Sequence, residues 1–220
     1  MTQPVGLINV DVPPDVLGLT RFIFHTAKIP LVHLPAPRLR EPACLDDYSA
    51  VLFPGGGPEL YQRDLGADGI AHLTAFVERG GGLIGICAGC IFLHQVGLLT
   101  GQLFSMAGIG IYNLNNKRKD HPVFAGCADV SRILRVNGPF IEVAPPTESL
   151  ADYEPTGRYA CIVTRTLGRG RIVGFSAHPE GGLAWGGGHY NPHFYYDGTV
   201  NGTDRLLKNA LAWVTEPSYP

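Results

Sequence analysis

The sequence predicts a single α/β domain spanning residues 1–220, with a parallel sheet covered by helices on both faces and extra antiparallel strands in its second half. Three observations support this prediction. Short apolar runs alternate with segments of helical spacing in the first part of the chain, a pattern typical of parallel sheets buried on both faces. From about residue 100 onward the segments become β-like, with few helical stretches between them. The chain, at 220 residues, is also long enough to bury a sizeable core.

Each element has a local reason. Apolar runs that end at proline, glycine or acidic residues predict strands at 5–10, 30–34, 50–53 and 83–86. Apolar residues at helical spacing predict helices at 15–28, with Asp15 as its N-cap, and at 69–79, and a helical run at 91–96. β-like segments follow at 103–113, 131–143 and 159–175, the last containing a strand at 171–175. The final helix is expected at 204–214, packing through Leu206, Leu207, Ala210, Leu211 and Trp213.

Composition and charge exclude several classes of protein. Only 16% of the residues are charged and the net charge is -2, which excludes a disordered chain and gives no reason to expect nucleic acid or an anionic membrane as a partner. We expect no secretory signal and no membrane span, because no basic and apolar leader and no apolar run of about 18 residues is present. Five irregularly spaced cysteines favour the reducing cytoplasm over a disulfide framework.

Glycine and proline are unusually frequent, with 29 and 18 residues, and several of these glycines flank three predicted strand ends. The strand ends are followed by Gly55–Gly57, by Cys87, and by His178 with Glu180. Ligands of open α/β sheets bind at the carboxyl ends of the strands. The glycines therefore indicate places where backbone comes close to a ligand.

Cys87 stands between a predicted strand and a predicted helix, with Gly85 and Gly89 on either side. An isolated cysteine is usually a small core residue, but this strand, turn and helix context favours a nucleophile elbow. A helix N-terminus favours the thiolate, and the N–H of Ala88 would point near the sulfur. Cys87 is therefore a candidate nucleophile.

His178 and Glu180 follow a strand near the other end of the chain. A thiol nucleophile needs a histidine to take its proton, and that histidine needs a carboxylate to fix its tautomer. The bare backbone of Gly55, Gly56 and Gly57 can approach a tetrahedral oxyanion closely, although a plain loop is an equal alternative for that segment.

The motifs at the three strand ends resemble those of a known class of enzymes. Phe53-Pro-Gly-Gly-Gly, Gly85-Ile-Cys-Ala-Gly and His178-Pro-Glu180 resemble, in that order, the oxyanion strand, nucleophile elbow and His/Glu pair of class I glutamine amidotransferases. The segment 50–92 is more similar to the family typified by the amino-terminal domain of biotin–protein ligases, and Asn137-Gly-Pro-Phe140 resembles a later part of that family's pattern. The resemblance implies a flavodoxin-like three-layer sandwich.

It also implies roles for single residues. Cys87 would be the nucleophile, His178 the general base and acid, and Glu180 its orienting partner. Ala88 and one of Gly55–Gly57 would form the oxyanion hole. Further candidate substrate-binding residues are Asn137, Ile91, Tyr61, His189 and Tyr190.

The chain departs from the amidotransferase pattern at one position. Amidotransferases that hydrolyse glutamine usually carry a glutamine four residues after the nucleophile, where this chain has Ile91, and Cys90 is also atypical. The expected substrate is therefore a small-molecule amide or related acyl compound, with glutamine left open. A synthase or ligase is a candidate partner, and no cofactor or metal is expected.

Several alternatives remain open at the level of sequence. Cys87 and Cys90 form a C-x-x-C that would suit a redox dithiol or half a zinc site. His189, His193 and Asp197 would suit a metal if helical, but the glycines and Pro192 favour a loop at 186–196, for which a lid over a substrate and an ordinary surface loop are equal alternatives. For function, the alternatives are a non-catalytic partner or regulatory domain and a thiol-dependent lyase or isomerase.

Overall fold

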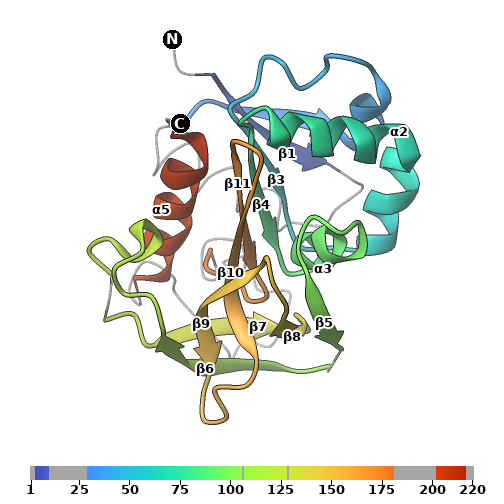
Figure 1. Cartoon of the computed structure of the whole chain (residues 1–220). Helices are drawn as coiled ribbons and strands as arrows, with labels where there is room; N and C mark the ends of the chain where they lie inside the picture. Colours follow the sequence, from blue (N-terminus) through green and yellow to red (C-terminus); the bar gives the residue numbers. More distant parts are fainter. Residues whose placement is uncertain (1–2, 10–28, 106, 128, 181–201, 217–220) are drawn as a thin grey trace, which may run out of the picture.

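The structure is a computed structural model that describes residues 3–9, 29–105, 107–127, 129–180 and 202–216 (Figure 1). The helix expected at 15–28 and the loop expected at 186–196 lie outside the described residues.

Five parallel strands form the first part of the sheet, as predicted. Their spatial order is β2 (Leu31–Pro35), β1 (Val5–Asn9), β3 (Ala50–Phe53), β4 (Gly82–Ile86) and β11 (Gly170–Phe175). The strands of the second half extend this sheet in antiparallel fashion, which confirms the predicted elaboration. They follow β11 in the order β10 (Ala160–Leu167), β9 (Glu148–Tyr153), β6 (Ile109–Asn116) and β7 (Arg132–Val136), while β5 (Gly101–Phe104) pairs with β8 (Phe140–Val143) beside β10.

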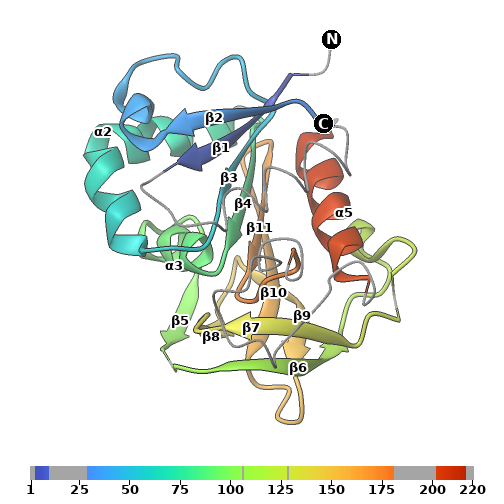
Figure 2. The same ribbon diagram turned by 180° about the vertical axis from the view of Figure 1, so that it is seen from behind.

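Helices cover both faces of the parallel strands. Helices α2 (Pro58–Glu78) and α3 (Ala88–Gln95) lie on one face and α5 (Thr203–Thr215) on the other, as Figure 1 and the reverse view in Figure 2 show. The antiparallel strands gather at one end of the molecule in both views. Among the described helices, none combines the length with the apolar composition that a membrane span requires.

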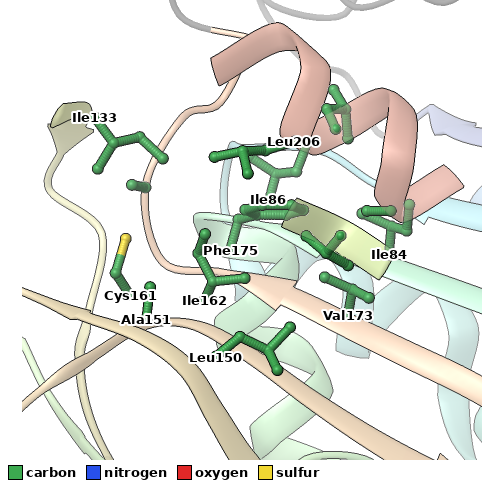
Figure 3. Close-up of a cluster of buried hydrophobic side chains, with 14 of the residues drawn as sticks. Ile84, Ile86, Ile133, Leu150, Ala151, Cys161, Ile162, Val173, Phe175 and Leu206 are labelled. Atoms are coloured by element: carbon green, nitrogen blue, oxygen red, sulfur yellow. The ribbon is translucent and has the colours of Figure 1, made fainter. Parts of the chain in front are cut away.

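The two layers of core follow from the two-residue period of the strands. Along β3, Ala50 and Leu52 face the core that contains α5, whereas Val51 and Phe53 face the core that contains α2 and α3. Figure 3 shows Ile84, Ile86, Val173 and Phe175 gathered under Leu206 of α5. Each such side chain stabilises the fold by about 1.5–3 kcal/mol when it is fully buried. The buried residues of α5 include four of the five predicted, while Trp213 is only partly buried and Val214 is buried in addition.

Two helix starts and one strand differ from the sequence-based expectation. Helix α2 begins at Pro58, eleven residues before the predicted start at 69, because Gly57 caps it and Pro58 suits a first helical position. Its backbone is non-helical at Gly66 (φ 59°, ψ -173°), which interrupts the periodicity that the prediction used. Helix α3 begins at Ala88 and not at Ile91, and β9 was not predicted.

The edge strand β7 folds back toward the parallel part of the sheet. The N–H of His178, just beyond β11, donates to the carbonyl of Leu134 in β7 at 2.8 Å, forming an isolated antiparallel bridge. The antiparallel extension thus curls until its last strand meets the chain that leaves β11. This closure places β7 directly beside the predicted site.

Candidate active site

The strand register brings the three predicted strand ends together. Phe53 of β3 lies opposite Gly85 of β4, and Ile86 of β4 lies opposite Phe175 of β11. The residues after these strands therefore share one edge of the sheet. A Cβ atom built on Gly55 would lie 3.3 Å from Cε1 of His178 and 3.9 Å from Cβ of Cys87.

Cys87 has the backbone of a sharp strand-to-helix turn. Its φ of 51° and ψ of -108° are unusual for a residue with a side chain, and such conformations cost about 1–3 kcal/mol. Two hydrogen bonds hold it: its N–H donates to Phe175 at 2.8 Å, and its carbonyl accepts from Ile91 at 3.0 Å. The elbow is thus fixed from both β11 and the first turn of α3.

The glycines of the elbow are sterically required. A Cβ on Gly85 would lie 2.8 Å from the backbone of Gly89 and Cys90, and a Cβ on Gly89 would lie 2.1 Å from the carbonyl oxygen of Phe53. Because backbone atoms cannot move aside cheaply, a side chain at either position would push α3 away from the sheet.

The Cys87 thiol is 9% exposed and sits at the N-terminus of α3. Its sulfur lies 3.5 Å from the carbonyl oxygen of Val136, to which the thiol donates. Strand β7 therefore contacts both Cys87, through Val136, and His178, through Leu134.

His178 and Glu180 form a buried pair. Nδ1 of His178 lies 2.8 Å from Oε1 of Glu180, and the two residues are 3% and 1% exposed. With the carboxylate as acceptor, Nδ1 carries the proton and Nε2 remains for Cys87. Burial by itself lowers the pKa of His178, but the charges of Glu180 and Cys87 and their hydrogen bonds outweigh burial and raise that pKa well above its ordinary value.

The Gly55–Gly57 segment begins beside His178 and Cys87, and Ala88 follows Cys87 directly. Gly55 is buried against His178, Gly56 is exposed with a φ of 134°, and Gly57 caps α2. Ala88 is the first residue of α3, so its N–H is among the donors that helical geometry leaves without an intrahelical acceptor. The Pro54 carbonyl accepts the N–H of Gly89 at 3.1 Å, which ties the glycine segment to the elbow.

The predicted substrate-binding residues differ in position and in exposure to solvent. Asn137 is exposed next to Val136, and its Oδ1 accepts the N–H of Gly108 at 2.7 Å. Ile91 is half-buried in the first turn of α3. Tyr61 does not face a substrate: it is 0% exposed behind the glycine segment, which corrects that expectation. His189 and Tyr190 lie outside the described residues.

Cys90 belongs to the core and not to the site surface. It is fully buried among the side chains between the sheet and α3, whereas Cys87 belongs to the core on the other side. Burial raises the pKa of the Cys90 thiol, so this group stays protonated. All five cysteines are free thiols, and no group of three metal-ligating side chains occurs in the described ranges.

Arg135 is a feature of the site region that sequence reasoning missed. It is 1% exposed, its Nε donates to Gly138 at 2.9 Å, and its guanidinium lies 4.2 Å from the ring centroid of Phe140. Gly138 leaves no room for a side chain, since a Cβ there would lie 1.7 Å from the carbonyl oxygen of Ser176. A charged residue in a β-like segment normally indicates a solvent-facing position, so no local signal marks this burial.

Comparison with known proteins finds similarity at the level of family and fold. Residues 33–96 match the family described as biotin-protein ligase, N terminal. The imidazole glycerol phosphate synthase subunit HisH of Chromobacterium violaceum is 28% identical over 164 residues, which cover 64% of this chain and 75% of that protein.

Solved structures share the fold over nearly the whole chain. A chain in the structure of PurLQS from Thermotoga maritima has a TM-score of 0.72 at 16% identity and covers 97% of this chain and 99% of its own length. A glutamine amidotransferase from Thermotoga maritima has a TM-score of 0.68 at 16% identity, covering 98% and 99%. Together with the strand order, these similarities show that the chain has the fold of class I glutamine amidotransferases, and the two sequence matches are similarities to that group of proteins.

Proposed function

We propose that the chain is a cysteine-dependent amidohydrolase or amidotransferase subunit that acts on a carboxamide or related acyl group through a thioester. The observation that carries this proposal is the buried His178–Glu180 pair beside the elbow of Cys87. Acyl transfer needs a nucleophile, a base and an oxyanion site. The candidates here are a thiol on a strained backbone at a helix N-terminus, a histidine with a fixed tautomer, and the adjacent glycine segment.

The reaction follows from the roles of these groups. His178 Nε2 holds the proton given up by Cys87 while the sulfur attacks the carbonyl carbon, and the backbone N–H groups of Ala88 and of Gly55 or Gly56 stabilise the resulting oxyanion. The imidazolium then gives its proton to the leaving nitrogen as the C–N bond breaks. A water molecule, deprotonated by His178, attacks the thioester, and the returning proton restores the thiol as the acid leaves. The sum is amide plus water to carboxylic acid plus amine or ammonia.

The substrate class and partner are also proposals. The half-buried Ile91 stands where glutamine-hydrolysing relatives usually place a glutamine, so glutamine is only one member of the class of amides to be tried. One relative bears the name of a synthase subunit, which supports a synthase or ligase partner that receives the released ammonia. The five free thiols support a cytoplasmic setting.

The direct test is ammonia release from a panel of carboxamides that includes L-glutamine, with the wild type and Cys87→Ala compared. We expect the substitution to lower turnover of any accepted amide by roughly 10,000-fold or more, because no other group replaces the nucleophile. Cys44→Ala is the matched control, since Cys44 is a partly buried free thiol far from the site in the fold. Full turnover by Cys87→Ala would contradict the proposal.

A non-catalytic regulatory domain is the second candidate, and Ile91 is the observation that favours it. That function requires no reactive thiol, so it predicts slow alkylation of Cys87 by iodoacetamide near neutral pH. Rapid alkylation supports the enzymatic proposal instead. Turnover of a thiol-dependent substrate without ammonia or amine release would point to the remaining alternative, a lyase or isomerase.

A further inference from the structure

Tyr61 holds the glycine segment from behind. Its hydroxyl oxygen lies 2.8 Å from the carbonyl oxygen of Pro54 and 3.2 Å from that of Gly55. Burial raises the pKa of the Tyr61 phenol, with the charge of Cys87 adding to the effect, so the hydroxyl stays protonated and donates.

The ring of Tyr61 is fixed by packing. It stands edge-on to Phe53 with centroids 5.4 Å apart, and it lies 5.6 Å from the ring of Phe92 in α3. Phe53 is the last residue of β3, so the same aromatic cluster fixes both the strand end and the hydroxyl that reaches past it. The hydroxyl is therefore a fixed point against which the glycine segment is held.

The two carbonyl contacts of Tyr61 also orient the N–H groups of Gly55 and Gly56. In a trans peptide the C=O and N–H point in opposite directions. The Pro54 carbonyl shares its peptide unit with the N–H of Gly55, and the Gly55 carbonyl shares its unit with the N–H of Gly56. Drawing both carbonyls toward Tyr61 therefore turns both N–H groups away from it.

The remaining contacts show what these amides face. Gly89 also donates to the Pro54 carbonyl, so that peptide unit is held from α3 as well as from α2. Gly55 faces Cε1 of His178 and Cβ of Cys87 through the space where its own side chain would be. Among the described residues, neither Gly55 nor Gly56 donates its N–H to a protein acceptor.

We propose that Tyr61 is a positioning residue for the oxyanion hole: its hydroxyl holds the Pro54 and Gly55 carbonyls so that the N–H groups of Gly55 and Gly56 face the carbonyl attacked by Cys87. This role rests on the proposed acyl transfer. In this role Tyr61 affects the stabilisation of the tetrahedral intermediate. It does not affect the nucleophilicity of the Cys87 thiol.

Two probes that react with the same thiol distinguish these properties. p-Nitrophenyl acetate acylates Cys87 through a tetrahedral oxyanion and releases nitrophenolate, whereas iodoacetamide alkylates it by direct displacement with no oxyanion. In Tyr61→Phe we expect the acylation rate to fall about 10-fold, less than the ~100- to 1,000-fold lost when an oxyanion donor is removed outright. The alkylation rate should stay at the wild-type value. Tyr48→Phe, which alters a partly buried tyrosine near the opposite ends of the strands, should change neither rate.

A second variant distinguishes loss of the hydrogen-bond donor from misfolding of Tyr61→Phe. Replacing Tyr61 with 4-aminophenylalanine keeps a donor at the end of the ring, so it should restore most of the acylation rate lost in Tyr61→Phe. If Tyr61→Phe lowers both rates equally, lowers neither, or is not rescued by the amino analogue, the positioning role is wrong. If the wild type is alkylated but never acylated, the proposed acyl transfer fails, and the positioning role fails with it.

Discussion

At the scale of single residues, Glu180 decides the charge of His178. The raised pKa of His178 means that the folded protein keeps a proton there that the unfolded chain releases above its ordinary pKa of about 6.5. The pair therefore contributes stability that is fully present below about pH 6.5 and is lost as pH rises through the raised pKa.

Glu180→Gln should remove most of this effect. Without the carboxylate, only Cys87 opposes the effect of burial, so the pKa of His178 should fall. The free energy of unfolding should then drop more at about pH 6 than at about pH 9, by about 1.4 kcal/mol for each unit that the pKa falls. Urea unfolding at the two pH values measures this difference. Turnover of an accepted amide should fall roughly 100- to 10,000-fold, because the tautomer of His178 is no longer fixed.

Glu148→Gln provides the control for that experiment. Glu148 forms an ion pair with Arg118, and its side chain is 65% exposed, so its loss should change stability little at either pH. An equal loss of stability at both pH values in Glu180→Gln would show that His178 does not carry the extra proton.

At the scale of elements, the junction of β4 and α3 depends on the close approach of two backbones. In Gly89→Ala the new Cβ meets the Phe53 carbonyl, so α3 must shift away from β3 and take Cys87 with it. We expect a loss of about 1–3 kcal/mol in stability and slower alkylation of Cys87 by iodoacetamide. Denaturant unfolding and alkylation kinetics measure the two effects.

Gly97→Ala is the matched comparison at the other end of α3. A Cβ there meets nothing within 4 Å, but the φ of 76° is strained for alanine, so stability should fall by about 1–2 kcal/mol with no change in alkylation rate. If both variants alkylate at the wild-type rate, the elbow does not depend on this contact.

The elements also show where periodicity succeeds and fails. The short apolar strands were predictable because they are buried on both faces and end at glycine or proline. The start of α2 was not, since Gly57 and Pro58 suit a loop as well as a helix start and Gly66 interrupts the helical periodicity, so packing against the sheet decides the conformation there.

At the scale of the whole molecule, the central strands should be the most stable part of the fold. Every residue of β4 is buried, whereas β2 at the edge of the described sheet is mostly exposed or half-buried. Hydrogen exchange followed by mass spectrometry should therefore find β4 exchanging slowest, near the global unfolding limit, and β2 much faster. Equal protection of the two strands would contradict this stability gradient.

The sequence by itself determined the order of the strand-end motifs, because each is a local pattern of glycine, a functional side chain and an apolar strand. It thereby placed Cys87, His178 and Glu180 at one edge of a parallel sheet. Only the tertiary structure decided which groups surround them. The return of β7 to His178, the burial of Arg135 and the place of Tyr61 behind the glycine segment depend on contacts between residues far apart in the chain, and no local periodicity encodes these contacts.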